Sequence, residues 1–151
     1  MFLDKNTIKD ILHHRDPFLF VDTANYISKD QIETSYFLSN THAVFDVHFP
    51  GNPIMPGVLL IEAIAQSAGI LIIYNVIQEK KCDLKCLKHE SFLVKVNTVK
   101  FKKKITPDST ITIKVKLSSV LSEFYEAVGQ VYVDQKLAAV GSVTLYFKLL
   151  A

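Results

Sequence analysis

Two side chains able to exchange protons, His48 and Glu62, flank a stretch rich in proline and glycine, residues 48–57. A histidine exchanges a proton near neutral pH, and a carboxylate among aliphatic neighbours can act as a general acid or base. Gly57 has no side chain, so a carbonyl oxygen can approach its backbone N–H closely. Gln66 follows Glu62 by about one helical turn and is placed to fix the carboxylate's orientation. Together these groups suit removal of a proton beside a carbonyl and expulsion of a hydroxyl group.

Each of these groups also has a purely structural explanation. A lone loop histidine is more often structural than catalytic, and a glutamate in an apolar helix can simply pair with Arg15 or a lysine. The prolines and glycines can serve only to shape the loop. The residues alone therefore leave a catalytic and a structural interpretation open.

The segment that carries Glu62, residues 58–77, is apolar on nearly every side. Such a helix is either a membrane span or a core helix enclosed by the rest of the protein. A carboxylate is costly in lipid, Gln66 adds a second polar group, and no other segment of this kind occurs in the chain. The sequence therefore predicts an enclosed core helix and no membrane span.

The sequence before the core helix predicts several short elements. Asn6 or Thr7 is the expected cap of the first helix, and Pro17 prevents its continuation. We expect a helix over residues 8–12, a strand from Phe18 to about Ser28, a strand over Ile32–Leu38, and a helical turn capped within residues 39–41 that ends near Asp46.

The sequence after the core helix predicts a lysine-rich connection from Asn75 to Glu90 and then consecutive strands, which favour antiparallel pairing. A break in the alternation at Asn97 and Thr98 indicates a bulge. The expected strands cover residues 91–101, 110–117, 124–133 and 137–149. We predict an α+β fold in a single domain, residues 1–151, with an antiparallel sheet wrapped around the core helix.

The composition is that of an ordinary globular domain, with 49% hydrophobic and 21% charged residues. The N-terminus lacks the apolar segment of a secretory signal. Cys82 and Cys86 could form a disulfide or bind a metal, but no further ligand completes a zinc site, and two free thiols suit a reducing compartment. We therefore expect a cytoplasmic protein without a metal.

The stretch from His48 to Gln66, HFPGNPIMPGVLLIEAIAQ, resembles the signature of the β-hydroxyacyl-acyl-carrier-protein dehydratases of the FabZ type. Residues 12–22, LHHRDPFLFVD, and residues 100–108, KFKKKITPD, resemble two further common segments of that family. In order and spacing, the three stretches cover nearly the whole chain.

The resemblance implies a hot-dog fold, a homodimer that often assembles as a trimer of dimers, and a site without a cofactor at the dimer interface. It implies that His48 is the base at C2 and that Glu62 of the other copy handles the C3 hydroxyl. It implies that the Gly57 N–H polarises the thioester carbonyl, and that Val58 and Gln66 contact the substrate. The related FabA type has aspartate at the glutamate position, so Glu62 argues against that isomerising branch.

Four positions depart from the family pattern. Val47 stands where glycine is usual, His13 where proline is common, and Thr23 where arginine is common. Phe92 appears at the position of a tyrosine that often gates the acyl tunnel. It is expected either to gate the tunnel and contact substrate or to be a core residue. None of these departures removes the catalytic pair, but they are compatible with a specialised acyl chain or carrier protein.

A cluster of lysines follows in the third stretch. If the strand continues through it, Lys100, Lys102 and Lys104 share one face, and with Arg15 they would attract an acidic acyl carrier protein. The alternative is a solvated edge that deters sheet-to-sheet pairing. Nucleic acid is disfavoured because no aromatic residue is interleaved on the lysine face and the net charge is only +2.

The sequence thus predicts dehydration of (3R)-hydroxyacyl-acyl-carrier-protein to the trans-2-enoyl thioester, in fatty-acid or related acyl-chain synthesis. Two alternatives remain: an acyl thioesterase of the same fold, which would not need the histidine loop, and a non-catalytic acyl-binding subunit. The intact pair of His48 and Glu62 favours the dehydratase. The sequence does not predict the preferred acyl length.

Overall fold

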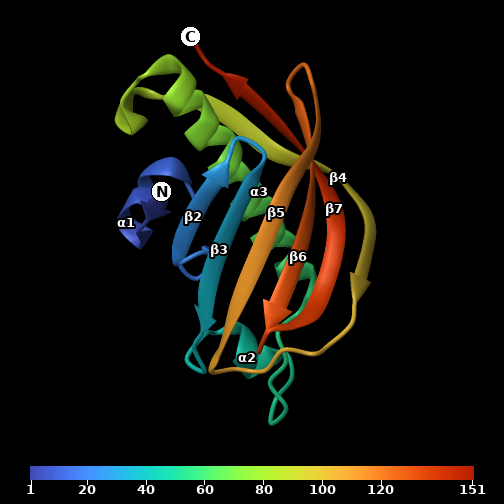
Figure 1. Ribbon diagram of the computed structural model, residues 1–151. Helices are drawn as coiled ribbons and strands as arrows, with labels where there is room; N and C mark the ends of the chain where they lie inside the picture. The colour runs from blue at the N-terminus through green and yellow to red at the C-terminus, as the bar shows by residue number, and fades with distance from the viewer.

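Seven antiparallel strands form one sheet, in the order β1-β2-β3-β5-β6-β7-β4, which wraps around a single long helix, α3 (Gly57–Lys80) (Figure 1). The computed structural model describes residues 1–151. Its strands are β1 (Phe2–Leu3), β2 (Thr23–Ser28), β3 (Gln31–Leu38), β4 (His89–Phe101), β5 (Ser109–Leu121), β6 (Phe124–Val133) and β7 (Lys136–Leu149). The remaining helices are α1 (Lys5–Ile11), α2 (Val44–Val47) and the 3-10 turn η1 (Leu84–Cys86). The predicted α+β class and hot-dog architecture are confirmed.

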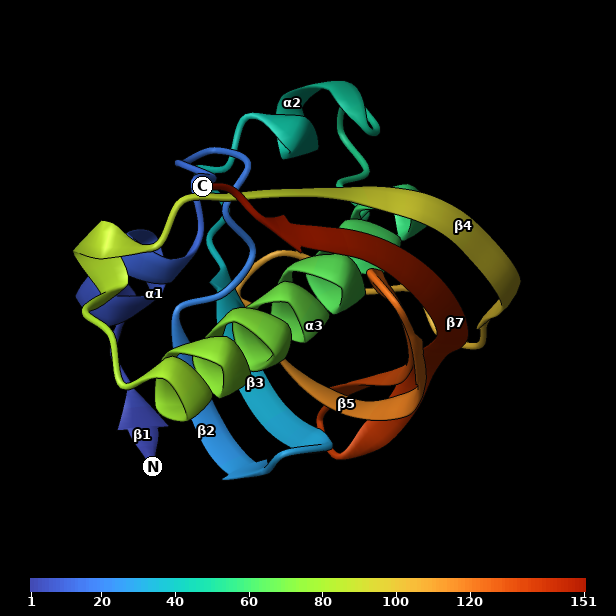
Figure 2. The same cartoon turned by 90° about the horizontal axis from the view of Figure 1, so that it is seen from above.

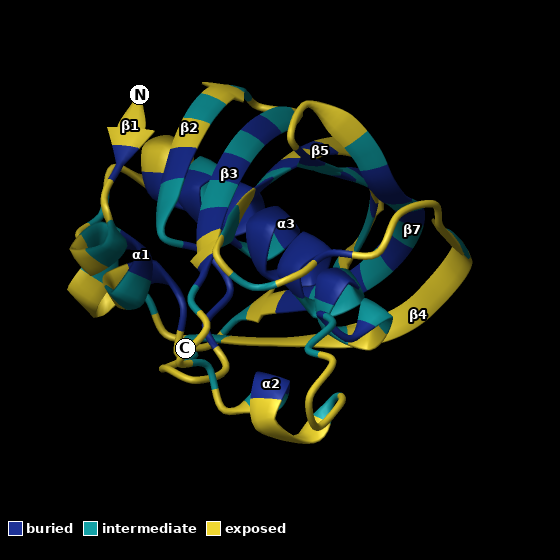
Figure 3. Cartoon of the chain, turned by 90° about the horizontal axis from the view of Figure 1, so that it is seen from below, coloured by how far each residue is buried: buried dark blue, intermediate teal, exposed yellow.

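Helix α3 is the core of the molecule, and the sheet curves around it (Figure 2). It is long and apolar enough to cross a membrane, but 67% of its most apolar window is buried inside the protein. Most of the helix is buried, as Figure 3 shows. Its buried Ser67 is satisfied, because the hydroxyl donates to the Ala63 carbonyl and lies 2.7 Å from the Thr34 hydroxyl. The helix is the enclosed core helix that the sequence predicts.

The polar connection begins later than predicted, because α3 continues through Asn75 to Lys80. The Asn75 amide donates to the Lys29 carbonyl and accepts from the Tyr26 hydroxyl, so the β2–β3 hairpin satisfies this polar side chain without ending the helix. The helix ends at Lys80, and the next residue, Lys81, has a left-handed backbone. Cys82 and Cys86 are not joined by a disulfide.

Two predictions about the first 30 residues are wrong. The cap of α1 is Asp4, whose carboxylate accepts from the Thr7 backbone N–H and hydroxyl, and these bonds lower the Asp4 pKa. The strand predicted from Phe18 begins only at Thr23. Its first residues do not join the sheet because the Phe20 N–H donates to a side chain of α3, at 2.8 Å, instead of a neighbouring strand.

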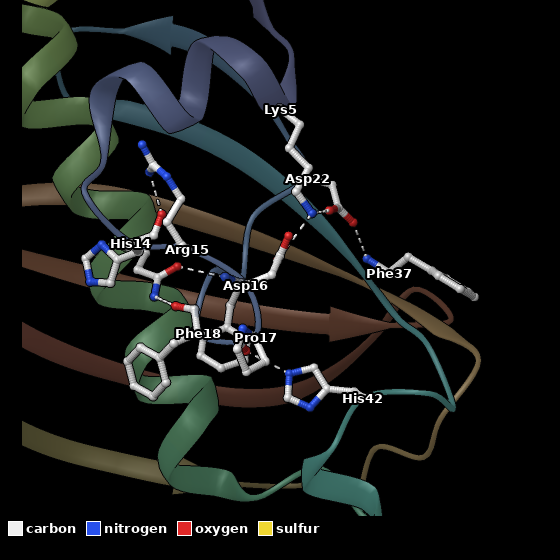
Figure 4. Close-up of polar contacts among 11 residues, drawn as sticks. Lys5, His14, Arg15, Asp16, Pro17, Phe18, Asp22, Phe37 and His42 are labelled. Atoms are coloured by element: carbon white, nitrogen blue, oxygen red, sulfur yellow. Dashed lines mark hydrogen bonds and ion pairs between the residues drawn. The ribbon is translucent and has the colours of Figure 1, made fainter.

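The helical turn before residues 48–57 also begins later than predicted, at Val44, and ends at Val47. The side chains expected to cap it, Ser39 and Thr41, bond to each other at 2.8 Å. His42 takes their place, because its Nδ1 accepts from the Val44 N–H and its Nε2 contacts the Pro17 carbonyl at 2.8 Å. Figure 4 shows His42 beside Pro17, a contact that links this turn to the segment after α1.

The edge strand β4 shows the predicted bulge: its pairing with β7 shifts between Asn97 and Lys100, and Thr98 has a positive φ. The strand ends at Phe101, so the prediction that Lys100, Lys102 and Lys104 alternate along one strand is wrong. The chain leaves the sheet there because two successive N–H groups, of Lys102 and Lys103, both donate to the Ala138 carbonyl.

Candidate active site

His48 is held by its own loop. It directly follows α2, and its Nδ1 lies 2.7 Å from the Ile54 carbonyl oxygen. Since a carbonyl only accepts, Nδ1 carries the proton, and Nε2 of the neutral ring is left with a free lone pair. The Phe49 ring stacks on the imidazole with 4.0 Å between centroids. His48 is therefore oriented as a proton acceptor.

The cavity beside His48, about 540 Å³ in volume, also contains the start of α3. The backbone N–H groups of Gly57 and Val58 donate no hydrogen bond within the chain, as is usual for the first residues of a helix. A Cβ on Gly57 would lie only 2.9 Å from the Phe101 ring, so glycine permits this close packing. The free donors and the helix dipole make this end of the cavity suited to an oxygen that gains negative charge.

Glu62 lies in a second cavity, of about 330 Å³, on the wall formed by α3. Its Oε1 accepts from the Gln66 amide at 2.9 Å and lies 3.3 Å from Nε2 of His14. Its Oε2 has no hydrogen-bond partner in the chain. One carboxylate oxygen is thus fixed while the other is left for a ligand.

Gln66 connects Glu62 to the segment that follows α1. Its amide also donates to the Phe18 carbonyl at 2.9 Å, and its oxygen accepts from the Phe20 N–H at 2.8 Å. The side chain is 2% exposed. Both amide hydrogens are therefore used within the protein, and Gln66 orients Glu62 as the i, i+4 spacing predicts.

His14 is the site residue that the sequence did not single out. It stacks on Phe18, and both line the Glu62 cavity; Figure 4 shows the two rings together. Its Nδ1 is buried without a partner. The only signal in the sequence was its place in the second family-like stretch, because its contact with Glu62 spans 48 residues of chain and no local pattern predicts it.

The structure separates the predicted site residues into two groups. His48, Gly57 and Val58 line the first cavity, together with Lys102 and Lys104. The second cavity contains Glu62, Gln66 and Phe92, and no residue lines both cavities.

The remaining predicted docking residues line neither cavity. Arg15 is exposed, and its guanidinium donates to the carbonyl of Leu12 and to that of His14, which Figure 4 draws beside it. Lys100 is exposed on the edge strand β4. The chain contains no group of three His, Cys, Asp or Glu side chains placed to hold a metal ion.

The four departures from the family pattern lie in different surroundings. Phe92 stacks on Tyr146 at the cavity wall, with 4.9 Å between centroids. His13 stacks on His89 with 4.9 Å between centroids, and the Thr23 hydroxyl lies 2.6 Å from that of Ser35. Val47, in contrast, is 71% exposed beside the His48 loop.

Known structures of low sequence identity share this fold. A chain of the dehydratase heterocomplex ApeI:P from Xenorhabdus doucetiae superposes with a TM-score of 0.76 at 18% identity, covering 92% of this chain and 89% of that one. A hypothetical thioesterase from Streptococcus pneumoniae, solved with coenzyme A, gives a TM-score of 0.60 at 10% identity, covering 83% and 84%. These similarities concern the fold alone.

Sequence comparison identifies the family. The FabA-like domain model matches residues 12–142. The chain is 35% identical to the 3-hydroxyacyl-[acyl-carrier-protein] dehydratase FabZ of Streptococcus sanguinis, over 94% of this chain and 96% of that protein. It is 34% identical to the bifunctional enzyme LpxC/FabZ of Porphyromonas gingivalis, over 90% of this chain but only 28% of that longer protein. The chain belongs to the FabA-like family, among its FabZ-type dehydratases.

Proposed function

We propose that this protein converts (3R)-3-hydroxyacyl groups carried by acyl carrier protein into trans-2-enoyl thioesters, in fatty-acid synthesis in the cytoplasm. The observation that carries the proposal is the fixed orientation of two proton-transfer groups, His48 and Glu62, in a chain about 35% identical to FabZ dehydratases over nearly its whole length.

The His48 cavity supplies the base. Nε2 of His48 takes a proton from C2, next to the thioester carbonyl, because its Nδ1 is already protonated and bound to Ile54. Negative charge then develops on the carbonyl oxygen. The free N–H of Gly57 stabilises that oxygen at the positive end of α3.

The Glu62 cavity supplies the acid. Oε2 of a protonated Glu62 gives its proton to the C3 hydroxyl, so that the C3–O bond breaks and water leaves as the C2–C3 double bond forms. Gln66 and His14 both contact Oε1, and this leaves Oε2 for the substrate. In each turnover His48 gains one proton and Glu62 loses one. Return of a proton from His48 to Glu62 after product release restores the enzyme.

The two halves of the site come from two copies of the chain. His48 and Glu62 line cavities without a common residue, which supports a site where one substrate contacts His48 of one copy and Glu62 of the other. Strand β4 is the last strand of the sheet, and its exposed apolar side chains include Phe92, Leu93, Val94 and Val96. An exposed apolar edge strand is a template for pairing with another chain. A homodimer joined at this strand would bring the two cavities together. Such dimers would assemble further as a trimer of dimers.

The product of a carrier-bound substrate tests the proposal. Incubation with a panel of 3-hydroxyacyl-acyl-carrier-proteins, followed by mass spectrometry, should show loss of one water with the acyl group still on the carrier. A parallel assay for free thiol should stay negative. Release of thiol without dehydration would instead establish an acyl thioesterase, and binding without either change would establish a non-catalytic acyl-binding subunit.

A further inference from the structure

Gly69, in the middle of α3, is the glycine that neither a turn nor close packing explains. The chain contains five glycines. Gly51 has a positive φ of 72° and suits its turn. A Cβ on any of three others would lie within 3.0 Å of a neighbouring side chain: Gly57, Gly129 and Gly141.

Gly69 has room for a side chain. The nearest atom to its ideal Cβ is Cδ2 of Leu12, at 3.6 Å, which is an ordinary van der Waals distance. Glycine is also the least favourable residue after proline inside a helix, because it adds backbone entropy to the unfolded chain. Alanine would therefore fit and would stabilise α3, so packing and helix formation both fail to account for glycine here.

The open space at Gly69 belongs to the Glu62 cavity. Glu62, Gln66, Gly69 and Ile73 line its wall at spacings of three or four residues, which places them along one face of α3. The wall is polar at Glu62 and apolar from Gly69 to Ile73. The helical rise puts Gly69 about 10 Å beyond Glu62. Apolar residues of β7 lie across the cavity, among them Leu145 and Phe147.

We propose that Gly69 determines which acyl lengths the enzyme accepts, by keeping the apolar end of this cavity open. The inference rests on the proposed function, which places C3 of the substrate at Glu62. The carbons beyond C3 then extend along α3, and only a chain of medium length or longer passes Gly69 toward Ile73. A short acyl group ends before it reaches this glycine.

Two substitutions at Gly69 and one control test the proposal. Gly69→Ala adds one methyl group, and Gly69→Met adds a flexible side chain that fills the apolar end. Ala65→Val adds bulk to the same wall one turn after Glu62. Each variant is assayed with 3-hydroxybutyryl and 3-hydroxydecanoyl pantetheine, and calorimetry measures the binding of butyryl and decanoyl pantetheine. Calorimetry keeps the test independent of turnover.

Gly69→Ala should raise Tm by about 2–4 °C, and should lower kcat/KM for the decanoyl substrate about fourfold, the effect of excluding one methylene. Gly69→Met should lower it about 100-fold, with affinity for decanoyl pantetheine falling in parallel. The butyryl substrate should change less than about twofold in both. Ala65→Val should impair both substrates alike.

The possible failures differ. Folded Gly69 variants whose affinity and turnover keep the wild-type dependence on acyl length would overturn the role of Gly69. In another outcome, the wild type binds decanoyl pantetheine, the Gly69 variants bind it more weakly, and no protein dehydrates any substrate. That outcome would overturn the proposed function and leave the role of Gly69 in binding standing.

Discussion

The two cavities are built by contacts of different range along the chain. His48 is fixed by the Ile54 carbonyl, six residues away, and by its neighbour Phe49. Glu62 is fixed by Gln66, which is itself bonded to Phe18 and Phe20, and by His14, 48 residues earlier. The orientation of His48, the proposed base, therefore depends on one loop. The orientation of Glu62, the proposed acid, depends on the packing of the N-terminal segment against α3. Substitutions in distant parts of the fold should therefore disturb the orientation of Glu62 more than that of His48.

The largest effects should come from the two reacting groups themselves. We expect His48→Ala and Glu62→Gln each to lower kcat by roughly 10²–10⁴, the usual range for loss of a general acid or base. Glu62→Gln keeps the shape of the side chain, so Tm should change little. Steady-state kinetics measures the first effect and thermal unfolding the second. Full activity in Glu62→Gln would refute the role assigned to that carboxylate.

Mixing these two inactive variants tests whether the cavities meet between copies. In a mixed dimer, one site has both wild-type groups and the other has neither, so subunit exchange should restore part of the activity. The control is a mixture of each variant with itself. Mass spectrometry checks that the subunits have exchanged. If they have exchanged and activity does not recover, the whole site lies within one chain.

The next effect concerns Gln66. Gln66→Leu leaves the buried Phe20 N–H without an acceptor, which costs about 1–3 kcal/mol of stability. It also removes the hydrogen bond that orients Glu62, so we expect kcat to fall roughly 10- to 100-fold. Ser67→Ala is the matched control, because it removes buried hydrogen bonds on the same helix without touching Glu62. Equal losses of activity in the two variants would mean that Gln66 acts only through folding.

His14 tests the long-range contact alone. We expect His14→Leu to lower kcat about tenfold with little change in KM, because Nε2 of His14 lies 3.3 Å from Oε1 of Glu62 and we assign it to orienting that carboxylate. His13→Leu, at the preceding and exposed residue, should keep nearly full activity. The comparison of kcat and KM in the two variants is the measurement. A change in KM alone at His14 would indicate substrate contact instead.

The range of these contacts also explains how far the sequence was informative. The antiparallel sheet follows from consecutive strands with a period of two, and the bulge near Thr98 from a break in that period. The enclosed helix follows from an apolar segment without a polar face, and the orientation of Glu62 by Gln66 from their spacing. The late start of β2 could not be predicted, because the Phe20 N–H is bonded by a side chain 46 residues away. The separation of the two cavities and the contact between His14 and Glu62 are likewise products of tertiary packing.

A smaller effect is expected on the His48 side, at its lysines. Charge reversal of Lys100, Lys102 and Lys104 should raise KM about tenfold for substrates on the acidic carrier protein and leave pantetheine substrates nearly unchanged, because complementary charge acts mainly on encounter. Higher salt should reduce the difference. Reversal of three exposed lysines near the far end of α3 is the control: Lys80, Lys81 and Lys85. Equal losses on both kinds of substrate would assign the first set to folding or to the site.

The smallest effect should appear on the Glu62 side, where His89 stacks on the cavity residue Phe147 and on His13. Burial, with the nearby His13 adding to it, lowers the pKa of His89 below its ordinary value of 6.5. The unfolded chain then binds a proton more readily than the folded one, so stability is retained above pH 6.5 and falls as the pH drops through that value toward the lower folded pKa. His89→Phe keeps a ring that can stack and removes the titration. Between about pH 7.5 and pH 5.5, the wild type should therefore lose roughly 1–2 °C more in Tm than His89→Phe. Scanning calorimetry at the two pH values measures this difference, in which the histidines that do not contact residue 89 cancel. Equal losses of Tm in the two proteins would show that protonation of His89 does not lower the stability of the fold.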